Sequence, residues 1–295
     1  MFAHLATNGV LCYNQSRFYA RRCVMSVQEL QRHLHRLCGD SRITVLDTVP
    51  STNSHLRALA EQGAAFGSVT ALRQTAGRGR MGRQFYSPVR GLYWSILLRP
   101  PYTAEECLAL TPIAAVAAAE SLEAVYGVAP KIKWVNDLLL DDRKICGILT
   151  ESAVCADSLR PRYVIVGVGI NLAPPEGGFP EELREIAGTV LPAAEDYSIE
   201  QHARLLVTLQ ERFLYHYGHI QEKAYLEPYR SRLCMLGERI LVLENDTLRP
   251  AVAMDVDEDL RLLVRYEDGS LQWRSSGEIR IRREEASALY KFGDL

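Results

Sequence analysis

Apolar and polar positions follow two different periods along this 295-residue chain. The continuous apolar run Leu92–Leu98 predicts a strand in the interior of a sheet, because only a strand covered on both faces is apolar throughout. A helix predicted from about 103 to 126 is apolar on nearly every side over 113–119, so we expect it to be buried. Apolar positions three to four residues apart predict a further helix beginning at Ser198.

The remaining pattern predicts a mixed or antiparallel sheet with helices packed on it. The other helices are expected at 26–37, from 51 to about 62, and in a second segment reaching about 235. Strands are expected at 43–46, 68–74, 92–98, 131–134, 144–151 and 162–169, with Asn136–Asp137 ending one strand and Asp141–Asp142 forming a hairpin turn. Together these elements predict an α+β protein.

From Gly237 the pattern changes to short strands separated by tight turns. Five strands are expected in fewer than fifty residues, at 239–243, 251–255, 260–266, 271–273 and 279–282. Such spacing predicts a small β-barrel. We therefore divide the chain into an N-terminal extension with a short helix (1–40), a main domain (41–236) and a C-terminal domain (237–295).

Composition narrows the function classes without naming one. Hydrophobic residues make up 47% and charged residues 24%, with a net charge of −2, so we do not expect a nucleic-acid-binding protein. No apolar run approaches the length of a membrane span, so we expect no membrane association. The seven cysteines include no Cys-x-x-Cys pair, which favours a reducing, cytoplasmic location.

The first 24 residues contain arginines but no acid. This composition fits an organellar transit peptide, and it equally fits a start codon placed too early. We favour translation beginning at Met25, because periodic structure starts only at Val27.

The most unusual segment is residues 76–88, which we call the arginine loop. From Arg78 to Arg90 the chain carries four arginines and no acid. Three glycines, at 77, 79 and 82, let the backbone approach a ligand closely. These glycines also satisfy a dinucleotide-binding pattern, but no helix can follow through Tyr86–Pro88 and no acid follows about 20 residues later. A loop that closes over an anion is favoured over a merely solvated basic loop.

Four further motifs accompany the arginine loop. In order, the five segments resemble the biotin–protein ligases, whose patterns read STN, GRGRxGRxW-SP, KWPND, KxxGIL-E and GxGIN. They are Ser51–Asn53, the arginine loop, Lys131–Asp137, Asp142–Glu151 and Gly167–Leu172. Phe85 stands where the pattern has Trp, and Val135 where it has Pro. Phe85 keeps an aromatic wall, whereas Val135 loses a rigid turn.

The resemblance implies a fold and a reaction. The main domain would have the mixed-sheet fold of the biotin/lipoate ligases, which is similar to class II aminoacyl-tRNA synthetases, and the C-terminal domain would be SH3-like. The enzyme would use ATP with Mg²⁺ to convert biotin into biotinyl-5′-AMP. It would then transfer biotin to a lysine of a biotin carboxyl carrier protein, such as that of acetyl-CoA carboxylase. A homodimer is also expected.

The resemblance also implies site residues. The catalytic residues would be Arg78, Arg80, Lys144 and Asp137, with Asp137 acting as base or, together with Asn136, lying near the metal. Biotin and ATP would be bound by Ser51, Thr52, Asn53, Gln74, Arg78, Gly79, Arg80, Trp134, Asn136, Lys144, Gly147, Asn171 and Arg282.

Alternatives remain for several of these positions. The alternative role of Ser51 or Thr52 is that of a helix cap alone, and that of Asn171 is a turn residue. The alternatives for Asp137 are holding a metal or ending its strand. Arg280 and Arg282 alternate, so only one of them should face the main domain.

Three other functions compete with this one. A binding module without catalytic activity is disfavoured because Arg78, Arg80 and Lys144 are all present. Lipoate or octanoate attachment uses the same fold and the same charges, but the arginine loop and the C-terminal domain favour biotin. A biotin-sensing repressor needs a winged DNA-binding module, for which the 40 residues before position 41 are too few.

Overall fold

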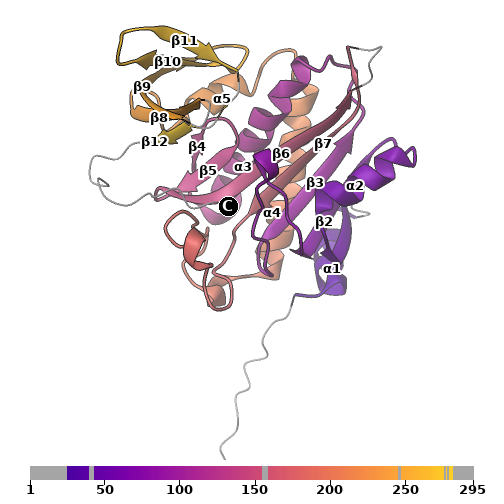
Figure 1. The fold of residues 1–295 in the computed structure, drawn as a ribbon. Coiled ribbons are helices and arrows are strands. Elements are labelled where there is room, and N and C mark those ends of the chain that lie inside the picture. The colour runs from indigo at the N-terminus through magenta and orange to yellow at the C-terminus, as the bar shows by residue number, and fades with distance from the viewer. Residues whose placement is uncertain are drawn as a thin grey trace, which may run out of the picture.

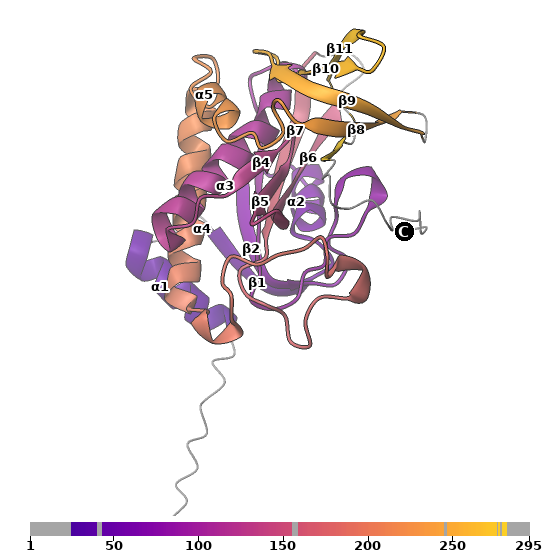
Figure 2. The ribbon, with the colours of Figure 1, turned by 90° about the vertical axis from the view of Figure 1, so that its left-hand side faces the viewer.

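The computed structural model describes residues 25–39, 43–154, 159–244, 247–275, 277 and 279–281. They form a large sheet with helices on both faces and a smaller sheet beside it (Figure 1). Seen from the side, α1, α3 and α4 form a layer on one face of the large sheet, and α2 lies on the other face (Figure 2). The predicted α+β class with a mixed sheet is confirmed.

Two helices begin with the serine caps predicted from the sequence. Ser26 accepts a hydrogen bond from the Glu29 backbone N–H at the start of the first helix, and Ser198 does the same for Gln201. These are the side-chain contacts that give serine its preference for helix starts. The helices are α1 (Val27–Cys38), α2 (Thr52–Glu61), α3 (Leu110–Tyr126), α4 (Ile199–Gly218) and α5 (Leu226–Arg230).

The large sheet has seven strands in the order β1-β2-β3-β7-β6-β5-β4. β1 and β2 are parallel, and every other neighbouring pair is antiparallel. The strands are β1 (Ile43–Val49), β2 (Gly67–Gln74), β3 (Leu92–Leu98), β4 (Lys131–Lys133), β5 (Asp137–Leu140), β6 (Arg143–Val154) and β7 (Pro161–Ile170). β3 is interior and all seven of its residues are buried, which confirms the prediction from its continuous apolar run.

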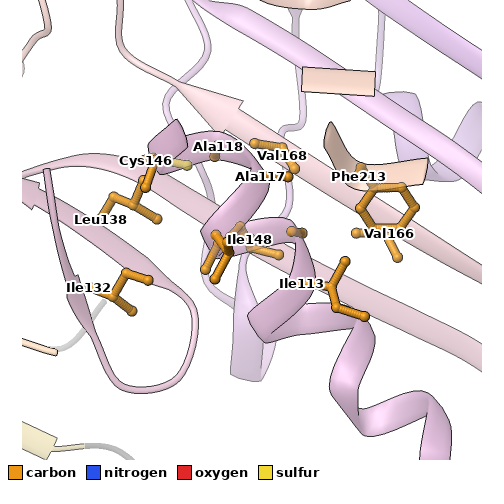
Figure 3. Close-up of a cluster of buried hydrophobic side chains, with 14 of the residues drawn as sticks. Ile113, Ala117, Ala118, Ile132, Leu138, Cys146, Ile148, Val166, Val168 and Phe213 are labelled. Atoms are coloured by element: carbon orange, nitrogen blue, oxygen red, sulfur yellow. The ribbon is translucent and has the colours of Figure 1, made fainter. Parts of the chain in front are cut away.

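Helix α3 lies at the centre of the core. Its alanine-rich middle is buried and packs against β5, β6 and β7, as Figure 3 shows for Ala117 and Ala118 near Val168. Within the described part of the chain, one helical segment, Glu106–Tyr126, is long and apolar enough to cross a membrane by length and composition. It comes closer to a membrane span than we expected from the sequence, but 67% of its qualifying 18-residue window is buried, which is the pattern of a core helix.

The smaller sheet has five strands in the order β11-β10-β9-β8-β12 and is antiparallel throughout. It fits a small β domain, as predicted. Its strands are β8 (Arg239–Glu244), β9 (Thr247–Val256), β10 (Leu262–Tyr266), β11 (Leu271–Arg274) and β12 (Ile279–Ile281). One hydrophobic core continues from the large sheet into this one, and the Trp134 indole N–H donates to the Leu260 carbonyl at 2.9 Å.

Three local predictions need correction. The helix predicted from about 103 begins only at Leu110, because Thr103 and Glu106 hydrogen-bond to each other at the start of a separate short 3₁₀ turn. Asp137 begins β5 instead of ending a strand, because residues 134–136 turn the chain so that β4 and β5 pair. The helix expected to reach about 235 is α5, which ends at Arg230.

Candidate active site

A cavity opens where the start of α2, the arginine loop and the strands β6 and β7 meet. Its empty volume is about 470 Å³, including the part open to solvent. The lining residues are Ser51, Thr52, Asn53, Gln74, Arg78, Gly79, Arg80, Phe85, Tyr93, Asn136, Lys144, Gly147, Ile148, Leu149, Gly167, Val168 and Gly169.

Glycines make the floor of this cavity flat. A Cβ at Gly169 would lie 2.6 Å from Cε1 of Phe85, and one at Gly167 would lie 2.2 Å from Oδ1 of Asn53. Real Cβ atoms do not approach other atoms so closely, so side chains here would displace both neighbours. The floor therefore lets the Phe85 ring and the Asn53 amide lie directly on the sheet.

The start of α2 supplies the polar groups at one side. Ser51 is buried and makes no capping hydrogen bond with its side chain, although it is the N-cap residue. The Thr52 backbone N–H and hydroxyl both donate to Oε1 of Gln74, at 2.8 and 3.1 Å. The buried Ser95 hydroxyl lies 2.7 Å from the side-chain oxygens of both Thr52 and Asn53. This connected network fixes the orientation of groups that face the cavity.

Three cationic side chains enter the cavity, and each has an acceptor from this chain. Nζ of Lys144 lies 2.7 Å from Oδ1 of Asp137. The Arg80 guanidinium donates to Oδ1 of Asn136 at 2.8 Å. The Arg78 guanidinium lies 3.1 Å from Oε1 of Glu151. The three cations therefore bring positive charge to the cavity. Each is paired with an acceptor of this chain, which reduces the repulsion among them.

The arginine loop has a closely packed base. The Phe85 N–H donates to the Gly77 carbonyl at 2.9 Å, and a Cβ at Gly77 would lie 2.3 Å from the Phe85 carbonyl oxygen. Ser87 bridges Gln74 and the Phe85 carbonyl, with hydrogen bonds of 2.9 and 2.7 Å. The tip differs, since the Met81 side chain is 72% exposed. Glycine at 77 is thus required by the close approach of two backbone segments.

The structure brings most of the predicted site residues together. Asp137 does not line the cavity, but it reaches the cavity through Lys144. Trp134 and Asn171 are used inside the fold: Trp134 binds the smaller sheet, and the Asn171 amide donates to the carbonyls of Gly188 and Lys144. Their contact with a ligand stays a prediction, and Arg282 lies outside the described residues. The predicted residues that line the cavity are Ser51, Thr52, Asn53, Gln74, Arg78, Gly79, Arg80, Asn136, Lys144 and Gly147.

Sequence reasoning missed other residues of this site. Tyr93 lines the cavity from β3 and its hydroxyl donates to the Pro88 carbonyl at 2.6 Å. Burial raises the pKa of Tyr93 far above its ordinary value, so this hydroxyl stays neutral. The sequence predicted no role in the site for Glu151 or Arg57, although Glu151 ends one of the five motifs; both form ion pairs beside the cavity. The alternation of Gly167 and Gly169 along β7 was the available signal for the floor.

Comparison with known proteins identifies the class. The family model for the biotin/lipoate A/B protein ligase family matches residues 45–171. The biotin--[acetyl-CoA-carboxylase] ligase of Mycobacterium tuberculosis is 32% identical over 237 residues, which cover 76% of this chain and 83% of that protein. The fold is similar to the biotin protein ligase of Aquifex aeolicus solved with biotin and ATP, with a TM-score of 0.63 and 28% identity over 82% of this chain and 99% of that one.

The chain therefore belongs to the biotin protein ligase family. The bifunctional ligase/repressor BirA of Bacillus spizizenii is 41% identical over 150 residues. That match covers 50% of this chain and 46% of the BirA protein, so the chain spans about half the length of this curated relative.

Proposed function

We propose that this chain is an ATP-dependent ligase that activates biotin as biotinyl-5′-AMP and transfers it to a lysine. The observation that carries the proposal is the convergence of Arg80 and Lys144 on one glycine-floored cavity. Joining a carboxylate to a triphosphate brings two anions together, which requires cations of this kind. The names of the relatives, and the Aquifex aeolicus structure with biotin and ATP, support the same substrates.

In the first step, a carboxylate oxygen of biotin attacks the α-phosphorus of ATP. A new C–O–P linkage forms and pyrophosphate leaves, so no general base is required. Lys144 would exchange its bond to Asp137 for one to the reacting anions, and Arg80 would exchange Asn136 for phosphate oxygens. Both cations already lie at the cavity, so little reorganisation is needed when charge develops.

Magnesium would accompany the triphosphate. Among the described residues, no group of three or more His, Cys, Asp or Glu side chains is arranged to hold a metal ion. This fits Mg²⁺, which is commonly held by substrate phosphates with one or two carboxylates. We place the ion near the side-chain oxygens of Asn136 and Asp137, where it would neutralise phosphate charge.

The adenylate is a reactive mixed anhydride and must be kept from water. The arginine loop crosses the cavity, and its Phe85 ring lies on the glycine floor. A loop that closes over the intermediate excludes water and slows its release. We therefore assign water exclusion to the arginine loop and Phe85.

In the second step, a neutral lysine amine attacks the acyl carbon and AMP leaves. A lysine is normally protonated, so a carboxylate near the acceptor must take its proton. Once Lys144 has moved to the substrate, Asp137 is free to attract the incoming ammonium and accept that proton. We propose Asp137 as this base.

The remaining assignments are also proposals. The acceptor would be a biotin carboxyl carrier domain, as the name of the Mycobacterium tuberculosis relative suggests. Residues 41–236 would form the catalytic domain and 237–295 an SH3-like domain. The enzyme would act in the cytoplasm as a homodimer that binds neither nucleic acid nor membrane.

The test is ATP–pyrophosphate exchange with purified protein and, separately, biotin, lipoate or octanoate. Exchange with biotin alone supports the proposal. Exchange with lipoate or octanoate instead would assign the chain to acyl ligation of that substrate. Absence of exchange with all three acids would refute the proposed activity.

A further inference from the structure

Glu151 joins three separate parts of the site. Its Oε1 forms ion pairs with the guanidinium groups of Arg57 on α2 and of Arg78 in the arginine loop, the latter at 3.1 Å. Its Oε2 accepts a hydrogen bond of 2.9 Å from Nδ2 of the buried Asn53. The Glu151 side chain is only 17% exposed, whereas those of Arg57 and Arg78 are 36% and 44% exposed. A largely buried carboxylate with three donors has a well-defined position.

The two arginines nearest the cavity are held at different points along β6. Arg80 binds Asn136, whose amide donates to the Ile148 carbonyl at 3.1 Å. Arg78 binds Glu151, three residues further along the same strand, a separation of about 10 Å. Arg78 is therefore held by Glu151, while Arg80 is held by Asn136, the residue before Asp137, which pairs with Lys144.

Backbone contacts divide the arginine loop in the same way. At its base, Gly77 pairs with Phe85 and a bridge joins Arg78 to Gln84. At its tip, the Gly79 N–H donates to the Arg83 carbonyl at 2.7 Å, closing a tight turn around the exposed Met81. The ion pair with Glu151 thus lies where the base ends and the tip begins.

We propose that Glu151 and Arg57 are positioning residues that anchor the base of the arginine loop through Arg78. The tip with Arg80 can then move over a ligand while Gly77 to Gly79 keep their place in the cavity. Arg78 serves this anchor, and contact with phosphate is left to Arg80 and Lys144. Because Asn53 and Arg57 both lie on α2, the same carboxylate holds the start of α2 in register with the loop.

Limited trypsin digestion tests the anchor directly, since trypsin can cleave after either arginine. In the unaltered protein, cleavage at Arg80–Met81 should be faster than at Arg78–Gly79, with fragments identified by mass spectrometry. Glu151→Gln should raise cleavage at Arg78–Gly79 about tenfold relative to Arg80–Met81, because a hydrogen-bonded ion pair that limits local opening is lost. Arg57→Gln should raise it less, and Arg57→Lys should restore it.

A matched control is Glu200→Gln, which removes an exposed glutamate that pairs with Arg204 on the same helix. It should leave the ratio of the two cleavages unchanged. Equal cleavage at both bonds in the unaltered protein, or an unchanged ratio in Glu151→Gln, would overturn the anchor. This measurement needs no substrate, so it stands even if the proposed ligase activity fails.

Kinetics separate anchoring from a direct role in the reaction, and this part rests on the proposed function. In biotin-dependent pyrophosphate exchange, Glu151→Gln should raise the KM for biotin about tenfold with little change in kcat, because binding groups lose their position. Arg80→Gln should instead lower kcat. A fall in kcat at unchanged KM in Glu151→Gln would contradict an anchoring role.

Discussion

Replacing Lys144 with alanine removes the cation that we assign to the reacting anions. Nζ of Lys144 already lies 2.7 Å from one carboxylate oxygen, so it can approach a substrate oxygen as closely. Two unit charges about 4 Å apart interact by about 4 kcal/mol at the effective dielectric constant of a protein surface. The Lys144 side chain is 32% exposed, and solvent screening reduces this to about 2–3 kcal/mol, or about a hundredfold in rate.

The assay is biotin-dependent ATP–pyrophosphate exchange, followed for Lys144→Ala and for two companions. Lys131→Ala removes an exposed lysine of β4 and should keep the activity of the unaltered protein. The double variant Lys144→Ala with Asp137→Asn relieves the carboxylate left without its cation, so it should regain thermal stability but not exchange activity. A loss of less than about fivefold in folded Lys144→Ala would remove this residue from the chemistry.

Three further predictions concern the glycine floor of the cavity, the packing of the core and the dependence of stability on pH. Gly169→Ala places a Cβ 2.6 Å from the Phe85 ring, so it should raise the KM for biotin about tenfold. The control Gly218→Ala, whose Cβ has nothing within 4 Å, should leave the KM unchanged, and an equal KM for the two variants would contradict the packed floor. Trp134→Phe leaves the Leu260 carbonyl without its donor and should lower the Tm by about 3 °C in calorimetry. Burial lowers the pKa of His202 from 6.5 to about 4. Between pH 4 and 6.5 this side chain is therefore protonated in the unfolded chain but neutral in the folded protein. Stability should therefore fall by about 3 kcal/mol as pH drops from 6.5 to 4, and His202→Gln should flatten this slope in urea titrations.

Sequence periodicity was sufficient for the elements that depend on local pattern. Local pattern predicted the buried strand β3, the buried helix α3 and the capped start of α4. In each case the side chains of the segment itself carry the signal, either a continuous apolar run or a capping serine. β5 was missed since four residues carry too short a pattern, and pairing with β4 and β6 makes the strand. Most of the residues that line the cavity could be predicted, because the five motifs contain the polar and charged residues that bind a ligand.

Pairing within the site could not be predicted from the sequence. Arg78 and Arg80 look equivalent in a string of alternating glycines and arginines, yet Arg78 binds Glu151 on β6 and Arg80 binds Asn136 in the turn before β5. Arg57 lies on a helix face that periodicity describes as polar surface, and only the tertiary fold places it on Glu151. Long-range contacts of this kind are set by the packing of α2 on the sheet, which no local pattern reports.

The most direct measurement is the product formed when the purified protein is mixed with biotin and ATP–Mg²⁺ without any acceptor. After acid quenching, mass spectrometry should find biotinyl-AMP in about one-to-one ratio with the enzyme, together with released pyrophosphate. Addition of a biotin carboxyl carrier domain should then convert it to AMP and biotinylated lysine. Release of pyrophosphate without biotinyl-AMP, or no turnover of ATP in the presence of biotin, would contradict the account.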